Sequence, residues 1–300
     1  MNKWVSVALA GALLAGAGGT PAQAFNFWFS NTFNCGTPSA VPANCLGNTN
    51  GVLRPLNTPN DATVNQTGIL NNNYTTQGNT GFINATKNAV TVNQVGIGNQ
   101  NADIQAGKSN TANTTQVGLV NVNTSTQVGN SNKNDVGQGG IVNINSNSQL
   151  GNGNTNDTLQ LGVLNTNAST QANTGNTGSK NTTTQVGLLN DNTNTQAGKG
   201  NANTTTQVGA FNSNSSAQVT TGNGAGNTNT TTQVGAFNSN SSTQTGNGNT
   251  NKTTQGGFGN SSTTVQDGTG NTATTKQFGA GNSATTIQSG NGNTGGFTQY

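Results

Sequence analysis

The sequence predicts an all-β protein of the β-solenoid class, and three observations support this fold class. A glutamine recurs every eleven residues from Gln66 to Gln299, and 17 of the 20 intervals between these glutamines have this length. Only 28% of the residues are hydrophobic and 5% are charged, which argues against both an ordinary apolar core and a charged disordered chain. No proline follows Pro59, as expected for strands in hydrogen-bonded ladders. A short, strict period indicates one supersecondary unit that is stacked many times.

Residues 1–24 have the pattern of a secretory signal peptide. Lys3 supplies the positive charge, and the apolar stretch 5–17 is too short to span a bilayer as a helix. Ala22-Gln23-Ala24 is a typical cleavage signal, so we expect the mature chain to begin at Phe25 and to leave the cytoplasm. No later segment is apolar enough to predict membrane insertion.

Residues 25–60 lack the repeat and are expected to form an irregular N-terminal leader or cap. This region holds both cysteines of the chain, Cys35 and Cys45. In an oxidising compartment they are expected to form one disulfide that closes a small loop. A metal site at this pair is not expected, because the chain has no histidine to complete a tetrahedral shell.

Residues 61–300 form the repeat array, and its true period is 22 residues. The pair that follows Gln-x-Gly alternates between apolar, as in Leu119-Val120, and polar, as in Asn130-Ser131. The three longer intervals all follow glutamines of the polar class, so insertions are confined to one kind of turn. We therefore expect about ten two-stranded coils of the form strand–arc–strand–arc. They begin at Gln66, Gln94, Gln116, Gln138, Gln160, Gln185, Gln207, Gln233, Gln255 and Gln277.

Alternation within each unit predicts which side chains face the interior. The glutamine and the residues two and four positions before it are expected to point to one face of the strand, toward the interior. Most charged residues occupy the alternate positions, which point to the opposite face. Asp103 breaks this rule, and the sequence offers no explanation for it. The glycine after each glutamine allows the bend that leaves the strand. The asparagine after it suits the corner, because asparagine bonds to turn backbone and tolerates the left-handed region.

Identical amide side chains that stack at about 4.8 Å can bond to one another along the axis of a solenoid. The candidate functional site is therefore structural, a set of glutamine and asparagine ladders. The expected glutamine members are Gln94, Gln105, Gln116, Gln127, Gln138, Gln149, Gln160, Gln185, Gln196, Gln207, Gln233, Gln244, Gln255, Gln266, Gln277 and Gln288. The expected asparagine members are Asn99, Asn110, Asn121, Asn143, Asn165, Asn190, Asn201, Asn212, Asn238 and Asn282.

The repeat resembles that of the curlin family, the subunits of curli fibres. The family pattern is Ser-x5-Gln-x-Gly-x2-Asn-x-Ala-x3-Gln, and the segments 94–105 and 277–288 reproduce its spacing. The resemblance covers about residues 61–300. Most coils carry asparagine where the family has alanine, as at Asn192 and Asn214, and the array is longer than is typical of the family.

The resemblance implies a structural subunit of an extracellular functional amyloid fibre of a Gram-negative bacterium, which serves adhesion and the biofilm matrix. It implies that the main partner is a second copy of the chain. It also implies a nucleator subunit and an outer-membrane export channel. Whether this chain is the major subunit or the nucleator stays open. Since the repeat continues to Gln299, we expect open strand edges that template another copy.

Composition argues against several other function classes. The chain has no histidine or glutamate and only six aspartates, so no enzyme chemistry and no cofactor are predicted. The nine basic residues are scattered, which argues against nucleic-acid binding.

Two surface features keep other interpretations open. The apolar arc pairs are expected either to pack inside the corners or to form an exposed stripe that joins filaments side by side. Outward threonine pairs, such as Thr204 and Thr206, keep a secreted ice-binding or polysaccharide-binding solenoid as the alternative function.

Overall fold

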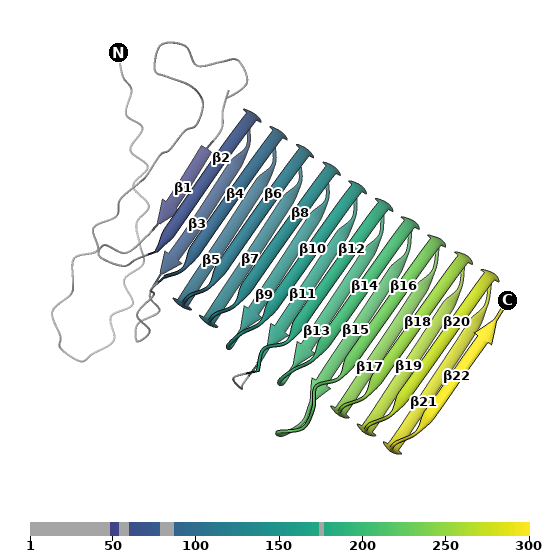
Figure 1. Cartoon of the computed structure of the whole chain (residues 1–300). Helices are drawn as coiled ribbons and strands as arrows, with labels where there is room; N and C mark the ends of the chain where they lie inside the picture. The colour runs from purple at the N-terminus through teal and green to yellow at the C-terminus, as the bar shows by residue number, and fades with distance from the viewer. Residues whose placement is uncertain (1–48, 54–59, 79–86, 174–176) are drawn as a thin grey trace, which may run out of the picture.

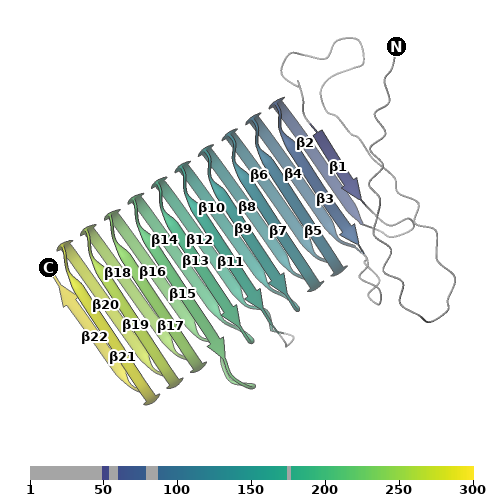
Figure 2. The same ribbon diagram turned by 180° about the vertical axis from the view of Figure 1, so that it is seen from behind.

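A computed structural model describes residues 49–53, 60–78, 87–173 and 177–300 of the chain. These residues form two parallel eleven-stranded sheets that lie against each other along the whole rod (Figure 1; Figure 2 shows the reverse side). None of the described segments is a helix long and apolar enough to cross a membrane. The predicted signal peptide and the predicted Cys35–Cys45 disulfide lie outside the described residues.

The strands alternate between the two sheets in chain order. The odd sheet contains β1 (Thr49–Leu53), β3 (Asn72–Gly78), β5 (Gln100–Lys108), β7 (Val122–Asn130), β9 (Ile144–Leu150), β11 (Thr166–Ala172), β13 (Asp191–Ala197), β15 (Ser213–Thr220), β17 (Ser239–Asn247), β19 (Ser261–Thr269) and β21 (Ser283–Asn291). The even sheet contains β2 (Asp61–Ile69), β4 (Ala89–Ile97), β6 (Thr111–Leu119), β8 (Lys133–Ile141), β10 (Thr155–Val163), β12 (Lys180–Leu188), β14 (Ala202–Ala210), β16 (Thr228–Ala236), β18 (Thr250–Phe258), β20 (Thr272–Ala280) and β22 (Thr294–Gln299).

Each strand therefore pairs with the strand one coil earlier and one coil later, and the register is the same throughout. Gln160 pairs with Gln138 on one side and with Gln185 on the other. The second of these pairs spans a longer interval, yet it keeps glutamine opposite glutamine. The predicted solenoid of about ten coils with a 22-residue repeat is confirmed.

The longer intervals all follow strands of the odd sheet. They separate β3 from β4, β11 from β12 and β15 from β16. The loop after β15 extends from the edge of the rod opposite the edge where the even strands end (Figure 1). All three insertions thus begin where odd strands end.

The structure adds one strand that the repeat does not predict. Residues Thr49–Leu53 form β1, which pairs in parallel with Asn72–Thr76 of β3. This segment lies in the region expected to be irregular and contains no glutamine of the series. The odd sheet therefore begins before residue 61.

The interior lies between the two sheets and is mainly polar. Side chains alternate between buried and outward along each strand, and the buried set contains the glutamine and the residues two and four before it. The only buried apolar cluster is near the N-terminal end of the described rod and contains Val64, Val90, Val92 and Ala112. Amides and hydroxyls must therefore supply most of the interior contacts.

The turns follow one backbone plan, which differs from the predicted one at one position. The glycine after Gln-x has a positive φ, as expected, for example +128° at Gly118. The second positive φ falls on the residue before the corner asparagine, as at Val120 with φ 54°, and not on the asparagine itself. The asparagine side chain is held by inward hydrogen bonds, which leaves the preceding residue to make the corner.

Candidate functional site

Glutamine side chains form two continuous chains of hydrogen bonds along the rod. In every link, Nε2 of one glutamine donates to Oε1 of the glutamine one coil further toward the C-terminus, at 2.8–3.1 Å. The even-sheet ladder contains Gln66, Gln94, Gln116, Gln138, Gln160, Gln185, Gln207, Gln233, Gln255, Gln277 and Gln299. The odd-sheet ladder contains Gln77, Gln105, Gln127, Gln149, Gln171, Gln196, Gln218, Gln244, Gln266 and Gln288.

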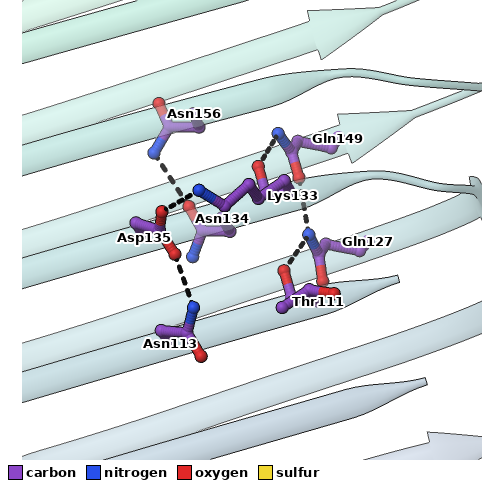
Figure 3. Close-up of polar contacts among 8 residues, drawn as sticks. All are labelled: Thr111, Asn113, Gln127, Lys133, Asn134, Asp135, Gln149 and Asn156. Carbon is purple, nitrogen blue, oxygen red and sulfur yellow. Dashed lines mark hydrogen bonds and ion pairs between the residues drawn. The ribbon is translucent and has the colours of Figure 1, made fainter. Parts of the chain in front are cut away.

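Most ladder amides also tie the two sheets together. Gln127 Nε2 donates to Gln149 Oε1 at 2.8 Å and to the carbonyl oxygen of Thr111 in the even sheet at 3.0 Å (Figure 3). Gln149 makes the equivalent bond to the Lys133 carbonyl at 2.8 Å. One side chain thus links neighbouring coils and both strands of a coil, which explains why glutamine is the most regular residue of the repeat.

The corner asparagines cap the turns. Asn121 Nδ2 donates to the carbonyl of Val117 at 3.2 Å and to Asn99 Oδ1 at 3.1 Å. Asn121 Oδ1 accepts the backbone N–H of Asn143, again at 3.1 Å. These bonds satisfy turn groups that would otherwise be buried without partners.

The ladder residues named from the sequence lie where the site requires them. All of those glutamines are buried, and so are the asparagines except Asn282, which is half-buried. Gln171 and Gln218, which precede insertions and were not among the named members, belong to the same ladder.

A further set of ladders comes from the asparagine four positions before the glutamine. In the odd sheet, Asn123 Nδ2 donates to Asn101 Oδ1 at 2.8 Å, and Asn145 Nδ2 donates to Asn123 Oδ1 at 2.6 Å. In the even sheet, Asn156 donates to Asn134 at 2.8 Å (Figure 3). Stacked inward amides were expected to bond to one another along the axis, but these asparagines were not among the named ladder members.

Asp103 is the one charged side chain in the described interior. It is fully buried, its Oδ2 accepts a hydrogen bond from Asn101 Nδ2 at 2.7 Å, and its Oδ1 has no partner among the described residues. At the equivalent position of another coil, Asn147 donates to Asn134 across the interior. The residue that corresponds to Asn134 beside Asp103 is Val90, which offers no donor. Burial raises the pKa of Asp103 to about 6, although the bond from Asn101 opposes this shift.

Two long edges of the rod differ in chemistry. Where the odd strands end, the turns are polar, as at Lys108-Ser109 and Asn130-Ser131. Where the even strands end, three outward positions per coil form what we call the apolar edge: the residue after the glutamine, the residue after the glycine, and the residue before the asparagine. Large apolar side chains there are 37–60% exposed: Leu70, Val95, Ile97, Val117, Leu119, Val120, Ile141, Leu161, Leu164, Leu188, Leu189, Val208, Phe211, Val234, Phe237, Phe258 and Phe278.

This exposure argues against the interpretation that the arc pairs pack inside the corners. Their side chains do not pack inside the corners; they stand outward and stack along the edge. The rings of Phe211 and Phe237 are parallel to within 3° with centroids 4.8 Å apart, the spacing of one coil. The sequence identified the residues of this stripe but not the side of the backbone on which they lie.

The apolar edge also contains strained backbone. The residue before the asparagine is large and apolar in seven coils and has φ between 54° and 59° there: Leu70, Val120, Val142, Leu164, Leu189, Phe211 and Phe237. The left-handed region costs roughly 1–2 kcal/mol for a residue other than glycine, and it is least suited to β-branched residues such as valine. The polar edge uses serine or glycine at this position, as at Ser131 and Gly153.

Replacing Gln160 with alanine is expected to lower the free energy of unfolding by about 2–3 kcal/mol, because buried partners lose their hydrogen bonds. Gln160 Nε2 donates to Gln185 Oε1 and to the carbonyls of Ile144 and Asn165, and Gln160 Oε1 accepts from Gln138. Guanidinium unfolding measures the effect.

The matched control is Thr204→Ala, which alters an exposed side chain. It should change stability by less than about 0.5 kcal/mol. Equal losses in the two variants would contradict the structural role of the ladder.

The described residues contain no group of three or more histidine, cysteine, aspartate or glutamate side chains that could hold a metal ion. The fold and the ladders define a repeat protein of the β-solenoid class. No protein-family model, curated protein or solved structure matches the chain. The resemblance to the curlin repeat accordingly rests on the spacing of the repeat residues.

Proposed function

We propose that the protein is a structural subunit of a curli-like extracellular fibre that grows end to end. The observation that carries the proposal is that the terminal strands of both sheets pair on one side only within the described residues. These are β1 and β2 at one end and β21 and β22 at the other. Unpaired parallel strands present rows of backbone N–H and C=O groups that template a further strand.

The interior of the rod supports the same proposal. One register joins every coil to the next, and each coil from β2 onward offers the glutamine position of the repeat to its neighbour. A second copy can therefore continue the stack by the contacts that already join coil to coil. The fibre would be cross-β, with strands perpendicular to its axis.

The biological setting is part of the proposal and comes from the signal-peptide pattern and the curlin-like spacing. The chain is secreted, assembles at the cell surface, and contributes to adhesion and to the biofilm matrix. Its partners are further copies of itself, a nucleator subunit and an outer-membrane export channel.

Purified chain incubated in buffer is expected to form unbranched fibres in the electron microscope. Aligned fibres should give a meridional X-ray reflection at about 4.7–4.8 Å, because this is the separation of neighbouring strands. Monomeric rods that never lengthen, or fibres without this reflection, would contradict the proposal.

One observation favours the alternative of a secreted ice-binding solenoid. Outward threonines stack in register on β12, β14 and β16, in the rows Thr182–Thr204–Thr230 and Thr184–Thr206–Thr232. Asp157 and Lys252 end the first row. Thermal hysteresis by monomeric protein would favour ice binding, and glycan binding without fibres would favour a polysaccharide-binding solenoid.

A further inference from the structure

We propose that the apolar edge is a lateral docking surface for the same edge of a second copy of this chain. Two rods would lie side by side, with the ends of their even strands in contact. This interface differs from the end-to-end contact of the proposed fibre, and it requires only that the solenoid folds.

The chemistry of the edge is that of a protein interface. Within β2–β20, the three outward positions of each coil hold no charged side chain. Most hold leucine, isoleucine, valine or phenylalanine, of which Phe237 is 51% and Phe258 is 58% exposed. A continuous apolar stripe of this length is rare on the surface of a monomer and marks an interaction site.

Backbone strain is an independent sign of function. Val120 and Val142 both lie on the apolar edge, and their φ values are 54° and 57°. β-branched residues rarely adopt this conformation. Glycine makes the same corner at Gly98, Gly259 and Gly281, so the fold does not require a large side chain there. The large side chains stack along the edge, as Phe211 does on Phe237, but they stay 38–60% exposed where they are largest, so a contact outside the rod is the best explanation for the strain.

The positions of the insertions agree with this inference. All three longer intervals follow odd strands, so the loops they add leave from the polar edge. The turns of the apolar edge keep one length from β2 to β21, with two residues between successive strands. A loop inserted there would hold a second rod away.

The size and spacing of the edge favour a second copy over another partner. Ten turns at about 4.8 Å, each with about 13 Å of extended chain, give a surface of about 600 Å² per rod. Two such surfaces bury about 1,200 Å², which reaches the lower limit of stable specific interfaces. A second rod also has the same coil spacing, as the Phe211–Phe237 stack shows, so it can match the edge at every coil.

Sedimentation of the soluble chain and electron microscopy of its assemblies test the proposal. The test variant carries glycine at six positions of the apolar edge: Val120, Val142, Leu164, Leu189, Phe211 and Phe237. Glycine suits the positive φ at each position, which offsets part of the packing lost along the edge, and circular dichroism of the variant checks that the solenoid still forms. We expect side-by-side pairs of the unmodified rods and at least a tenfold weaker pairing of the variant.

The matched control replaces outward apolar residues of the odd sheet, Ile104, Leu150, Val265 and Ile287, with threonine. It should pair like the unmodified chain. Equal pairing in the edge variant, equal loss in the control, or single rods only in the unmodified chain would each overturn the proposal. Fibres that grow as single rods would refute lateral docking alone, whereas paired rods that do not lengthen would refute end-to-end growth alone.

Discussion

Gly209→Ala is expected to break the stack between β14 and β16 and to lower the free energy of unfolding by more than about 4 kcal/mol, among the largest losses that single substitutions cause. Gly209 has φ +121°, and a Cβ there would lie 1.9 Å from the carbonyl oxygen of Gly235 in the next coil. The obstacle is backbone that is fixed by the sheet, so it cannot move without separating the coils. Guanidinium unfolding followed by circular dichroism measures the loss.

Gly259→Ala is the control for this variant. Gly259 also has a positive φ, +67°, but no atom lies within 4 Å of the position that its Cβ would take. Only the left-handed strain of about 1–2 kcal/mol is then expected. Similar losses at Gly209 and Gly259 would show that conformation, and not the close approach of coils, explains the glycine of the repeat.

Asp103→Asn is expected to stabilise the protein at pH 7 by up to about 3 kcal/mol and to remove most of its pH dependence between pH 4 and 6. The folded pKa of about 6 lies about two pH units above the ordinary aspartate pKa of 3.8, and each pH unit corresponds to about 1.4 kcal/mol. Asparagine keeps an oxygen for the bond from Asn101 but carries no charge.

The sign of the pH effect follows from proton binding. Between pH 3.8 and about 6 the folded state holds the Asp103 proton and the unfolded state has released it. Stability is therefore highest below the unfolded pKa and falls as the pH rises through the folded pKa. Unfolding of the soluble chain at pH 4 and pH 7 should show this fall in the unmodified protein and only a smaller one in Asp103→Asn, where partial burial still raises the pKa of Asp191.

The outward Asp157→Asn variant is the control, since its side chain is exposed. It should keep the fall in stability between pH 4 and pH 7, because Asp103 is unchanged in this variant. A fall of equal size in Asp103→Asn would place the titrating group elsewhere.

Most of the fold could be predicted because a single residue type, glutamine, marks the eleven-residue period of the sequence. The recurrence of glutamine requires a stack in which like residues pair, and the insertions after Gln77, Gln171 and Gln218 show which turns tolerate extra chain. Strand β1 could not be predicted in this way, because Thr49–Leu53 has no glutamine; it joins β3 through backbone pairing and through the bond from Asn73 Nδ2 to Asn50 Oδ1.

The corners were harder to predict from the sequence, for two physical reasons. Asparagine commonly adopts the left-handed region, but Asn121 uses its side chain as a cap, so Val120 takes the positive φ. The sequence gives the apolar character of Val120 but not its direction, which depends on the position of the bend. Asp103 occupies an inward position of its strand, as its place in the repeat predicts. The cause of its raised pKa becomes clear only in the structure, where Val90 lies opposite it.

The amide ladders give the rod a direction. Glutamine amides donate toward the C-terminal end at every link, as from Gln160 to Gln185. The inward asparagines donate the opposite way, as from Asn181 to Asn156. The two sets of side-chain dipoles therefore oppose each other along the axis, and the two ends of the rod differ in the donors and acceptors that they offer. A polymer built from such rods by head-to-tail addition would be polar, like an actin filament, and its two ends should grow at different rates.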